Sequence, residues 1–135
     1  MIKQLQKKIE YEEEKIYSKI VINEYRNPTY FGVIKNPDAI GKIKGPCGDT
    51  VKFSLKIKNE VITNANFWTD GCGTTLASGN MLIKIIMGKK IQDANKITAK
   101  DLVDALGGLP KENHHCAVLA INTLQKSIRN YQNKK

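Results

Sequence analysis

Three cysteines are the residues of this chain best suited to chemistry, and each stands in a turn-like context. These contexts are Pro46-Cys47-Gly48-Asp49, Gly71-Cys72-Gly73 and His114-His115-Cys116. Thiolates bind soft and borderline metals, and glycine lets the backbone approach such a site closely. The gaps between the cysteines are far longer than the CxxC spacing of zinc knuckles. The sequence therefore predicts one metal or sulfur site that assembles only on tertiary folding.

The positions of Cys72 and Cys116 predict reactive thiols. Each precedes or begins an expected helix, where unpaired backbone N–H groups and the positive end of the helix dipole stabilise a thiolate. We expect both to ionise more readily than an ordinary cysteine. A lone free cysteine is often just a small buried apolar residue, but three with glycine and histidine neighbours favour a metal or sulfur site.

Length and composition indicate a single small domain. The 135 residues suffice for one core, so we expect one domain over 1–135, with 1–15 as a charged N-terminal extension. No apolar run approaches the length of a membrane span. An odd number of cysteines and no secretion signal predict free thiols and a cytoplasmic location.

The formal charge of +9 suits acidic partners, or simply a solvated lysine-rich surface. The lysines are scattered and are not interleaved with aromatic residues, so nucleic-acid binding is not expected. A zinc-stabilised basic nucleic-acid module is the alternative that would explain the charge, and salt-sensitive DNA or RNA binding would support it.

Strands are predicted where apolar and polar residues alternate. Residues 51–58 alternate strictly, a short strand is expected over 39–44, and a third over 61–69. A hairpin turn is expected at Asn59-Glu60, before the third strand. The side chains of Val61, Thr63, Ala65 and Phe67 should lie on one side of that strand. This antiparallel pair brings Cys47 and Cys72 to one edge of the sheet.

Helices are predicted over 1–26, 74–87 and 98–106, and from Cys116 towards the C-terminus. Residue 98 is a threonine that can form a capping box with Asp101, and Gly79 can allow close packing. The first helix should bury Ile9, Ile16, Tyr17, Ile20 and Tyr25, and the last Ala117, Ala120, Ile121, Leu124, Ile128 and Tyr131. The expected fold class is α+β: a small antiparallel three-stranded sheet packed against helices, with an N-terminal helix and a long C-terminal helix.

Several sequence blocks between about Tyr17 and Tyr131 resemble a known family. In order they are Tyr17-Ser18-Lys19, Tyr25-Arg26-Asn27-Pro28, Gly45-Pro46-Cys47-Gly48-Asp49, Gly71-Cys72-Gly73, Leu109-Pro110 and His115-Cys116. Their order and spacing are similar to those of the NifU/IscU-type scaffold proteins for iron–sulfur cluster assembly.

The resemblance implies a function as a carrier and not as an enzyme. The chain would receive sulfur from a cysteine desulfurase of the NifS/IscS type, build a transient [2Fe-2S] cluster from iron and sulfide, and pass it to recipient apoproteins. Cys116 would be the persulfide acceptor. Tyr17 matches a tyrosine that the family associates with dimer formation, so a homodimer is compatible with the resemblance.

The resemblance also implies the ligands. Cys47, Cys72 and Cys116 correspond to the scaffold cysteines, Asp49 to an aspartate that keeps the cluster labile, and His115 to a histidine of the cluster and zinc site. A [2Fe-2S] cluster takes four ligands. With three thiolates available, the fourth is His115 or Asp49, and the sequence leaves both open. Asp49 could instead be an ordinary turn residue, and His114 a solvent-facing imidazole.

Two departures from the family pattern stand near the site. Members served by a dedicated Hsp70-type chaperone carry Leu-Pro-Pro-Val-Lys before the His-Cys pair. Here Asn113 replaces that lysine, which argues against recognition by such a chaperone. Asp70 stands where some members have tyrosine and could add a carboxylate near the site.

The enzyme alternative is a zinc-dependent sulfurtransferase of the SufU type. Those relatives carry an insertion between the second and third cysteines and lack the histidine before the last cysteine. This chain has His115 and no such insertion, so the scaffold interpretation is preferred. A zinc ion suits the same N, S and O donors and could occupy either protein.

Overall fold

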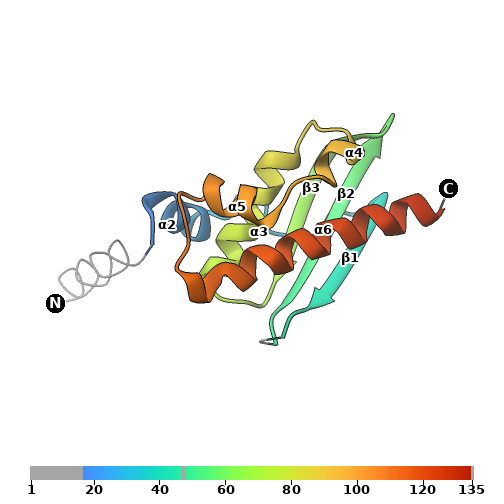
Figure 1. Cartoon of the computed structure of the whole chain (residues 1–135). Coiled ribbons are helices and arrows are strands. Elements are labelled where there is room, and N and C mark those ends of the chain that lie inside the picture. The colour runs from blue at the N-terminus through green and yellow to red at the C-terminus, as the bar shows by residue number, and fades with distance from the viewer. Residues whose placement is uncertain (1–16, 47, 135) are drawn as a thin grey trace.

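A three-stranded antiparallel sheet with helices packed against it forms the domain, and this confirms the predicted fold class (Figure 1). The computed structural model describes residues 17–46 and 48–134. The strands are β1 (Ala39–Lys44), β2 (Thr50–Lys58) and β3 (Val61–Thr69), in spatial order β1-β2-β3. The helices are α2 (Lys19–Arg26), α3 (Gly73–Ile86), α4 (Ile91–Ala94), α5 (Ala99–Ala105), the 3-10 turn η1 (Lys111–Asn113) and α6 (His114–Lys134).

Helix α2 covers Lys19–Arg26, and the two described residues before it are not helical although the sequence pattern predicted a helix over 1–26. It begins after Ser18, whose Oγ accepts a hydrogen bond from the backbone N–H of Val21 and so caps the helix. Val21 and Ile22 are its buried apolar residues, whereas Ile20 is 43% exposed. The predicted burial of Ile20 was therefore wrong, whereas Tyr17 and Tyr25 of the same predicted stripe are partly buried against the core. The part of the prediction on residues 1–16, including the charged extension, lies outside the described residues.

The strand predictions are confirmed at β1, β2 and β3, with one local error. Lys56 pairs with Asn64 and Ile57 with Ile62, so a β-bulge leaves Thr63 without a register partner. The bulge reverses the alternation, so Ile62 is fully buried and Thr63 is exposed. The hairpin turn has positive φ at both Asn59 and Glu60, as expected for a two-residue hairpin.

The helices cover one face of the sheet, where α6 lies along β1 and β2 and α3 lies along β3 (Figure 1). The contact between β1 and α6 requires a glycine. A Cβ on Gly41 would lie 2.4 Å from Oγ, 2.7 Å from the backbone N and 2.9 Å from Cα of Ser127. Gly79 fits in the same way, because a Cβ there would lie 2.5 Å from Cδ2 of Phe67. The absence of these two side chains sets how closely the helices approach.

The later helices follow the sequence closely. Thr98 and Asp101 form the predicted capping box at α5, and the N–H and hydroxyl groups of Thr98 lower the pKa of the Asp101 carboxyl. The buried stripe of α6 includes Ala117, Ala120, Ile121, Leu124 and Ile128, with Tyr131 partly buried beside it. The four-residue α4 was not predicted, since so short a segment shows no periodicity.

A buried polar cluster ties α2 to α3. Glu24 is 2% exposed, and its two carboxylate oxygens accept from Nδ2 of Asn80 and from Nζ of Lys84. Oδ1 of Asn80 accepts in turn from the backbone N–H of Tyr30. A buried carboxylate is tolerated when its oxygens are bonded in this way. The cluster holds α2 against the middle and last turns of α3, the helix that Cys72 caps.

The segment between α2 and β1 crosses the outer face of the sheet, opposite the helices. It first meets the outer edge of β3, where the backbone N–H of Gly32 donates to the carbonyl of Phe67. It passes over β2, where the N–H of Ile34 donates to Oγ of Ser54, and reaches the start of β1 at Asp38. Ser54 is only 1% exposed as a result. One part of the outer face is therefore covered, and the rest is open.

Candidate functional site

Cys72 lies where β3 ends and α3 begins, as the strand pattern predicted. It is the N-cap residue of α3 with an extended backbone, and its side chain is exposed. Val51 pairs with Thr69, so the start of β2 and the end of β3 meet at the same end of the sheet. Asp49 precedes β2 and arrives at this end as well. Cys47, the third predicted sulfur ligand, lies outside the described residues.

Cys116 reaches the same place from the first turn of α6, and the hydroxyl of Thr74 connects the two thiols. Oγ1 of Thr74 lies 3.1 Å from Sγ of Cys72 and 3.3 Å from Sγ of Cys116. Nδ2 of Asn113 donates to the same oxygen at 3.3 Å. The single hydroxyl hydrogen of Thr74 is thus left for one sulfur at a time. The two sulfurs of the described site therefore share the hydroxyl of Thr74.

Thr75 connects the thiols to the carboxylate. Its hydroxyl lies 3.3 Å from Oδ2 of Asp49, 3.4 Å from Sγ of Cys116 and 3.7 Å from Sγ of Cys72. Gly71 makes room for this arrangement, because a Cβ there would lie 2.7 Å from Oδ2 of Asp49 and 2.9 Å from Oγ1 of Thr75. Both threonines are buried. The glycine before Cys72 is therefore required by the close approach of Asp49.

His115 presents a nitrogen lone pair to the site. Its Nδ1 lies 2.9 Å from the carbonyl oxygen of Glu112, which can only accept, so Nδ1 carries the hydrogen. In the neutral imidazole Nε2 is then the unprotonated nitrogen, and it lies 3.6 Å from Sγ of Cys116. This tautomer is the one in which a histidine binds a metal through Nε2. The side chain is exposed, so the lone pair is accessible.

His114 has a different partner, since its Nε2 lies 3.0 Å from the carbonyl oxygen of Leu109. Asp70 is also committed elsewhere, because its Oδ1 accepts from the backbone N–H of Thr50 at 2.7 Å. It therefore secures the start of β2 and does not join the thiols. Residues 17–46 and 48–134 contain no group of three or more His, Cys, Asp or Glu side chains positioned to hold a metal ion.

The two described thiols differ in accessibility and in pKa. Burial raises the pKa of Cys116, which is 1% exposed, and the hydrogen bonds from Thr74 and Thr75 do not compensate. Partial burial would also raise the pKa of Cys72, but hydrogen bonds from the side chains and backbone of Thr74 and Thr75 outweigh it and lower that pKa. The prediction of a readily ionised thiol is borne out for Cys72. It was wrong for Cys116, since two residues of α6 precede this cysteine and the site buries its sulfur.

A groove of about 280 Å³ opens beside Cys72. Tyr17, Tyr25, Cys72, Gly73 and Thr74 line it, and the two tyrosine rings meet edge to face with centroids 6.5 Å apart. The ring of Tyr25 would lie 3.1 Å from a Cβ on Gly73. Cys72 is thus reached from solvent along two aromatic side chains.

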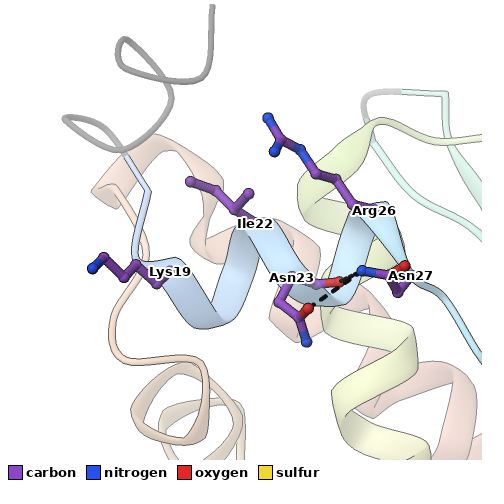
Figure 2. Close-up of a pocket in the computed structure, with 5 residues that line it drawn as sticks. All are labelled: Lys19, Ile22, Asn23, Arg26 and Asn27. Atoms are coloured by element: carbon purple, nitrogen blue, oxygen red, sulfur yellow. Dashed lines mark hydrogen bonds between the residues drawn. The ribbon is translucent and has the colours of Figure 1, made fainter. Parts of the chain in front are cut away.

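A second hollow, of about 250 Å³, lies along α2 (Figure 2). Lys19, Ile22, Asn23, Arg26 and Asn27 line it, and no cysteine is among them. The amide of Asn27 donates to the carbonyl and to the side-chain oxygen of Asn23, which closes the helix end. These polar groups terminate α2 and are separate from the thiol site.

Sequence reasoning missed Thr74, Thr75 and the bonding role of Asn113. The signal was present, because hydroxyls two and three residues after an N-cap cysteine lie in the first helical turn, near its side chain. Their contact with Cys116 could be known only from the packing of α6 against α3.

No helix among the described residues is long and apolar enough to cross a membrane.

The fold and this site define a class: small α+β domains that gather thiols, a carboxylate and an imidazole at one end of a three-stranded sheet. Residues 16–135 match the family model described as the NifU-like N terminal domain. The chain belongs to this family.

A curated relative supports the assignment. The chain is 37% identical over 122 residues to a protein of Aquifex aeolicus named iron-sulfur cluster assembly scaffold protein IscU, covering 88% of this chain and 78% of the relative.

Two solved structures share the fold. One is a nitrogen-fixing NifU-like protein (N-terminal) from Brucella abortus, with a TM-score of 0.70, 20% identity and coverage of 89% of this chain and 96% of that one. The other is a putative iron-sulfur cluster assembly scaffold protein for the SUF system from Fervidobacterium islandicum, with a TM-score of 0.68, 23% identity and coverage of 84% and 97%.

Proposed function

We propose that this protein is a scaffold for iron–sulfur cluster biogenesis. It accepts sulfur from a cysteine desulfurase, holds a transient [2Fe-2S] cluster as cargo, and transfers the cluster to recipient apoproteins. Membership of the NifU-like family and the name of the Aquifex relative support this function. The observation that carries it is the convergence of the Cys72 and Cys116 sulfurs on the hydroxyl of Thr74, with Nε2 of His115 3.6 Å from Sγ of Cys116.

The proposed cargo ligands are Cys47, Cys72, Cys116 and either His115 or Asp49. The Nε2 lone pair of His115 already faces the sulfur of Cys116, which makes it suited to complete the set. Asp49 is bonded to the hydroxyl of Thr75 and could compete for the same iron. A carboxylate bound in this way would be a harder, more exchangeable donor than a thiolate. Exchange between the two fourth ligands would favour release of the cargo.

Exposure bears on which thiol first receives sulfur. The resemblance points to Cys116, but its sulfur is buried, whereas Cys72 is exposed and has the lowered pKa. We favour Cys72 as the entry point. Its thiolate attacks the terminal sulfur of the desulfurase persulfide, one S–S bond forms as another breaks, and the desulfurase cysteine leaves as thiolate. Cys116 then lies next to the persulfide on Cys72, because the hydroxyl of Thr74 contacts both cysteine sulfurs.

Anaerobic reconstitution tests the function. Apoprotein incubated with ferrous iron, cysteine and a pyridoxal-phosphate cysteine desulfurase should develop visible sulfide-to-iron charge-transfer bands and contain acid-labile sulfide. Cys72→Ser should lose this chromophore while keeping a wild-type unfolding transition. A wild-type protein that stays colourless would refute the scaffold function. Tightly held zinc together with a strong increase in desulfurase rate would favour the SufU-type sulfurtransferase instead.

Asp49→Ala should slow the loss of the cluster. Removing the carboxylate removes the exchangeable donor and leaves the nitrogen and sulfur ligands in place. The measurement is the decay of the visible bands after addition of a chelator, with a several-fold slower decay expected. Asp93→Ala is the matched control, because Asp93 is an exposed aspartate of α4. Equal decay in wild type and Asp49→Ala would exclude this role of Asp49.

A further inference from the structure

The open part of the outer sheet face carries a row of side chains that the thiol site does not use. Lys42 of β1 pairs in register with Lys52 of β2, and Lys52 pairs with Trp68 of β3. With Val33 from the crossing segment, these residues line a groove of about 300 Å³. We name this set, Val33, Lys42, Lys52 and Trp68, the lysine–tryptophan row.

The row exposes apolar surface that the fold does not require. Val33 is 49% exposed and Trp68 is 36% exposed, although the chain has only one tryptophan. The neighbouring row of the same face is covered, since the crossing segment buries Ser54 and its Asp38 side chain bonds the N–H of Ile57. An aromatic side chain left in an open groove is typical of a protein interface.

The charge of the row is not balanced within the described residues. Neither Lys42 nor Lys52 has a carboxylate partner there, and no acidic residue lines the groove. The whole chain has a formal charge of +9. An apolar centre with two unpaired ammonium groups at its rim is complementary to an apolar or aromatic side chain flanked by carboxylates.

The row also lies close to the thiol site along the sheet. Trp68 is four residues before Cys72 on the same chain segment, and the next registered pair after Lys52 and Trp68 is Val51 with Thr69. A partner on the outer face would therefore be held beside the end of the sheet where Cys72 and Asp49 lie. The thiols themselves would stay accessible from the groove lined by Tyr17 and Tyr25.

We propose that the lysine–tryptophan row is a docking surface for an acidic protein segment, with an apolar side chain of the partner against Trp68 and Val33 and its carboxylates on Lys42 and Lys52. Single-stranded nucleic acid is the less favoured ligand, because it needs successive rings on which to stack and the groove has only one. The proposal is independent of the cargo chemistry, since none of the four residues is a proposed cluster ligand.

The sole tryptophan makes the test direct, because its fluorescence reports from the surface itself. The probe is a synthetic peptide of alternating glutamate and leucine with a central phenylalanine, titrated into the full-length apoprotein at physiological salt. Docking should change the intensity and blue-shift the emission of Trp68. The double variant Lys42→Glu, Lys52→Glu should weaken binding by about tenfold or more, because two attractive contacts become repulsive.

Lys58→Glu, Lys96→Glu is the matched control, since it changes the net charge equally at exposed lysines of β2 and of the segment after α4. It should bind nearly as well as wild type. Val33→Ser, which keeps the fluorophore, should weaken binding several-fold. Cluster reconstitution in the absence of any partner protein should give the same visible bands in the Lys42→Glu, Lys52→Glu protein as in wild type. A loss of docking is therefore distinguishable from a loss of the scaffold function.

Three outcomes would overturn the proposal. The first is no change in Trp68 emission with the peptide. The second is equal weakening in both double variants, which would show attraction by net charge alone. The third is a tighter response to an oligothymidine strand than to the peptide that is lost in Lys42→Glu, Lys52→Glu, which would assign the row to nucleic acid.

Discussion

Gly41→Ala should destabilise the domain by roughly 3 kcal/mol, the upper end for overpacking a tight contact. The added Cβ would lie within 2.9 Å of three atoms of Ser127, two of which belong to the backbone of α6. A flexible side chain could turn away, but α6 would have to move as a whole from β1. Helix α6 forms one side of the hydrophobic core, so several buried contacts would loosen together.

The measurement is thermal or urea unfolding of the apoprotein followed by far-UV circular dichroism. For a chain of this size we expect Tm to fall on the order of 10 °C. Ser127→Ala should not rescue Gly41→Ala, because the backbone N and Cα of Ser127 would still lie 2.7 and 2.9 Å from the new Cβ.

Gly88→Ala is the control. Its site is open but has φ of +82°, so it should cost about 1 kcal/mol from backbone strain alone. Unfolding of Gly41→Ala at the wild-type temperature would show that α6 does not approach β1 this closely.

Cys72 should be alkylated much faster than Cys116 in the metal-free protein. Cys116 is 1% exposed and must wait for local opening, and an opening that costs about 1.4 kcal/mol already slows the reaction tenfold. The thiolate is the reacting species, and the shifts in pKa add to the difference. The rate at Cys72 should level off at a lower pH than for a free cysteine. The rate at Cys116 should still be rising at that pH.

Iodoacetamide labelling over a series of pH values, with peptide mapping by mass spectrometry, measures each cysteine separately. In 6 M guanidinium, which removes the fold, Cys72 and Cys116 should react at similar rates. Thr74→Val should slow Cys72 at neutral pH, because the hydroxyl at 3.1 Å no longer stabilises the thiolate. Comparable rates for Cys72 and Cys116 in the folded protein would contradict both the burial of Cys116 and the entry of sulfur through Cys72.

The sequence alone determined the strands, the capping box and the position of Cys72. Alternation within 51–58 and the pairing of Thr98 with Asp101 depend on neighbours a few residues away, so they can be read directly from the chain. The family blocks around Cys47, Cys72 and Cys116 likewise identified the donors that the proposed function uses. The burial predicted for Ile20 was wrong, since which residues of α2 are buried depends on its packing against α3, and that packing buries Val21 and Ile22.

Tertiary structure alone decided how the donors relate to one another. The threonine hydroxyls bridge Cys72 and Cys116 only because α6 packs next to the first turn of α3, and the same packing buries Cys116 and raises its pKa. The register of the sheet set Lys42, Lys52 and Trp68 in one row, and the crossing segment left that row open. Contacts between residues far apart in the chain depend on the three-dimensional packing of whole elements. Local sequence patterns carry no information about that packing.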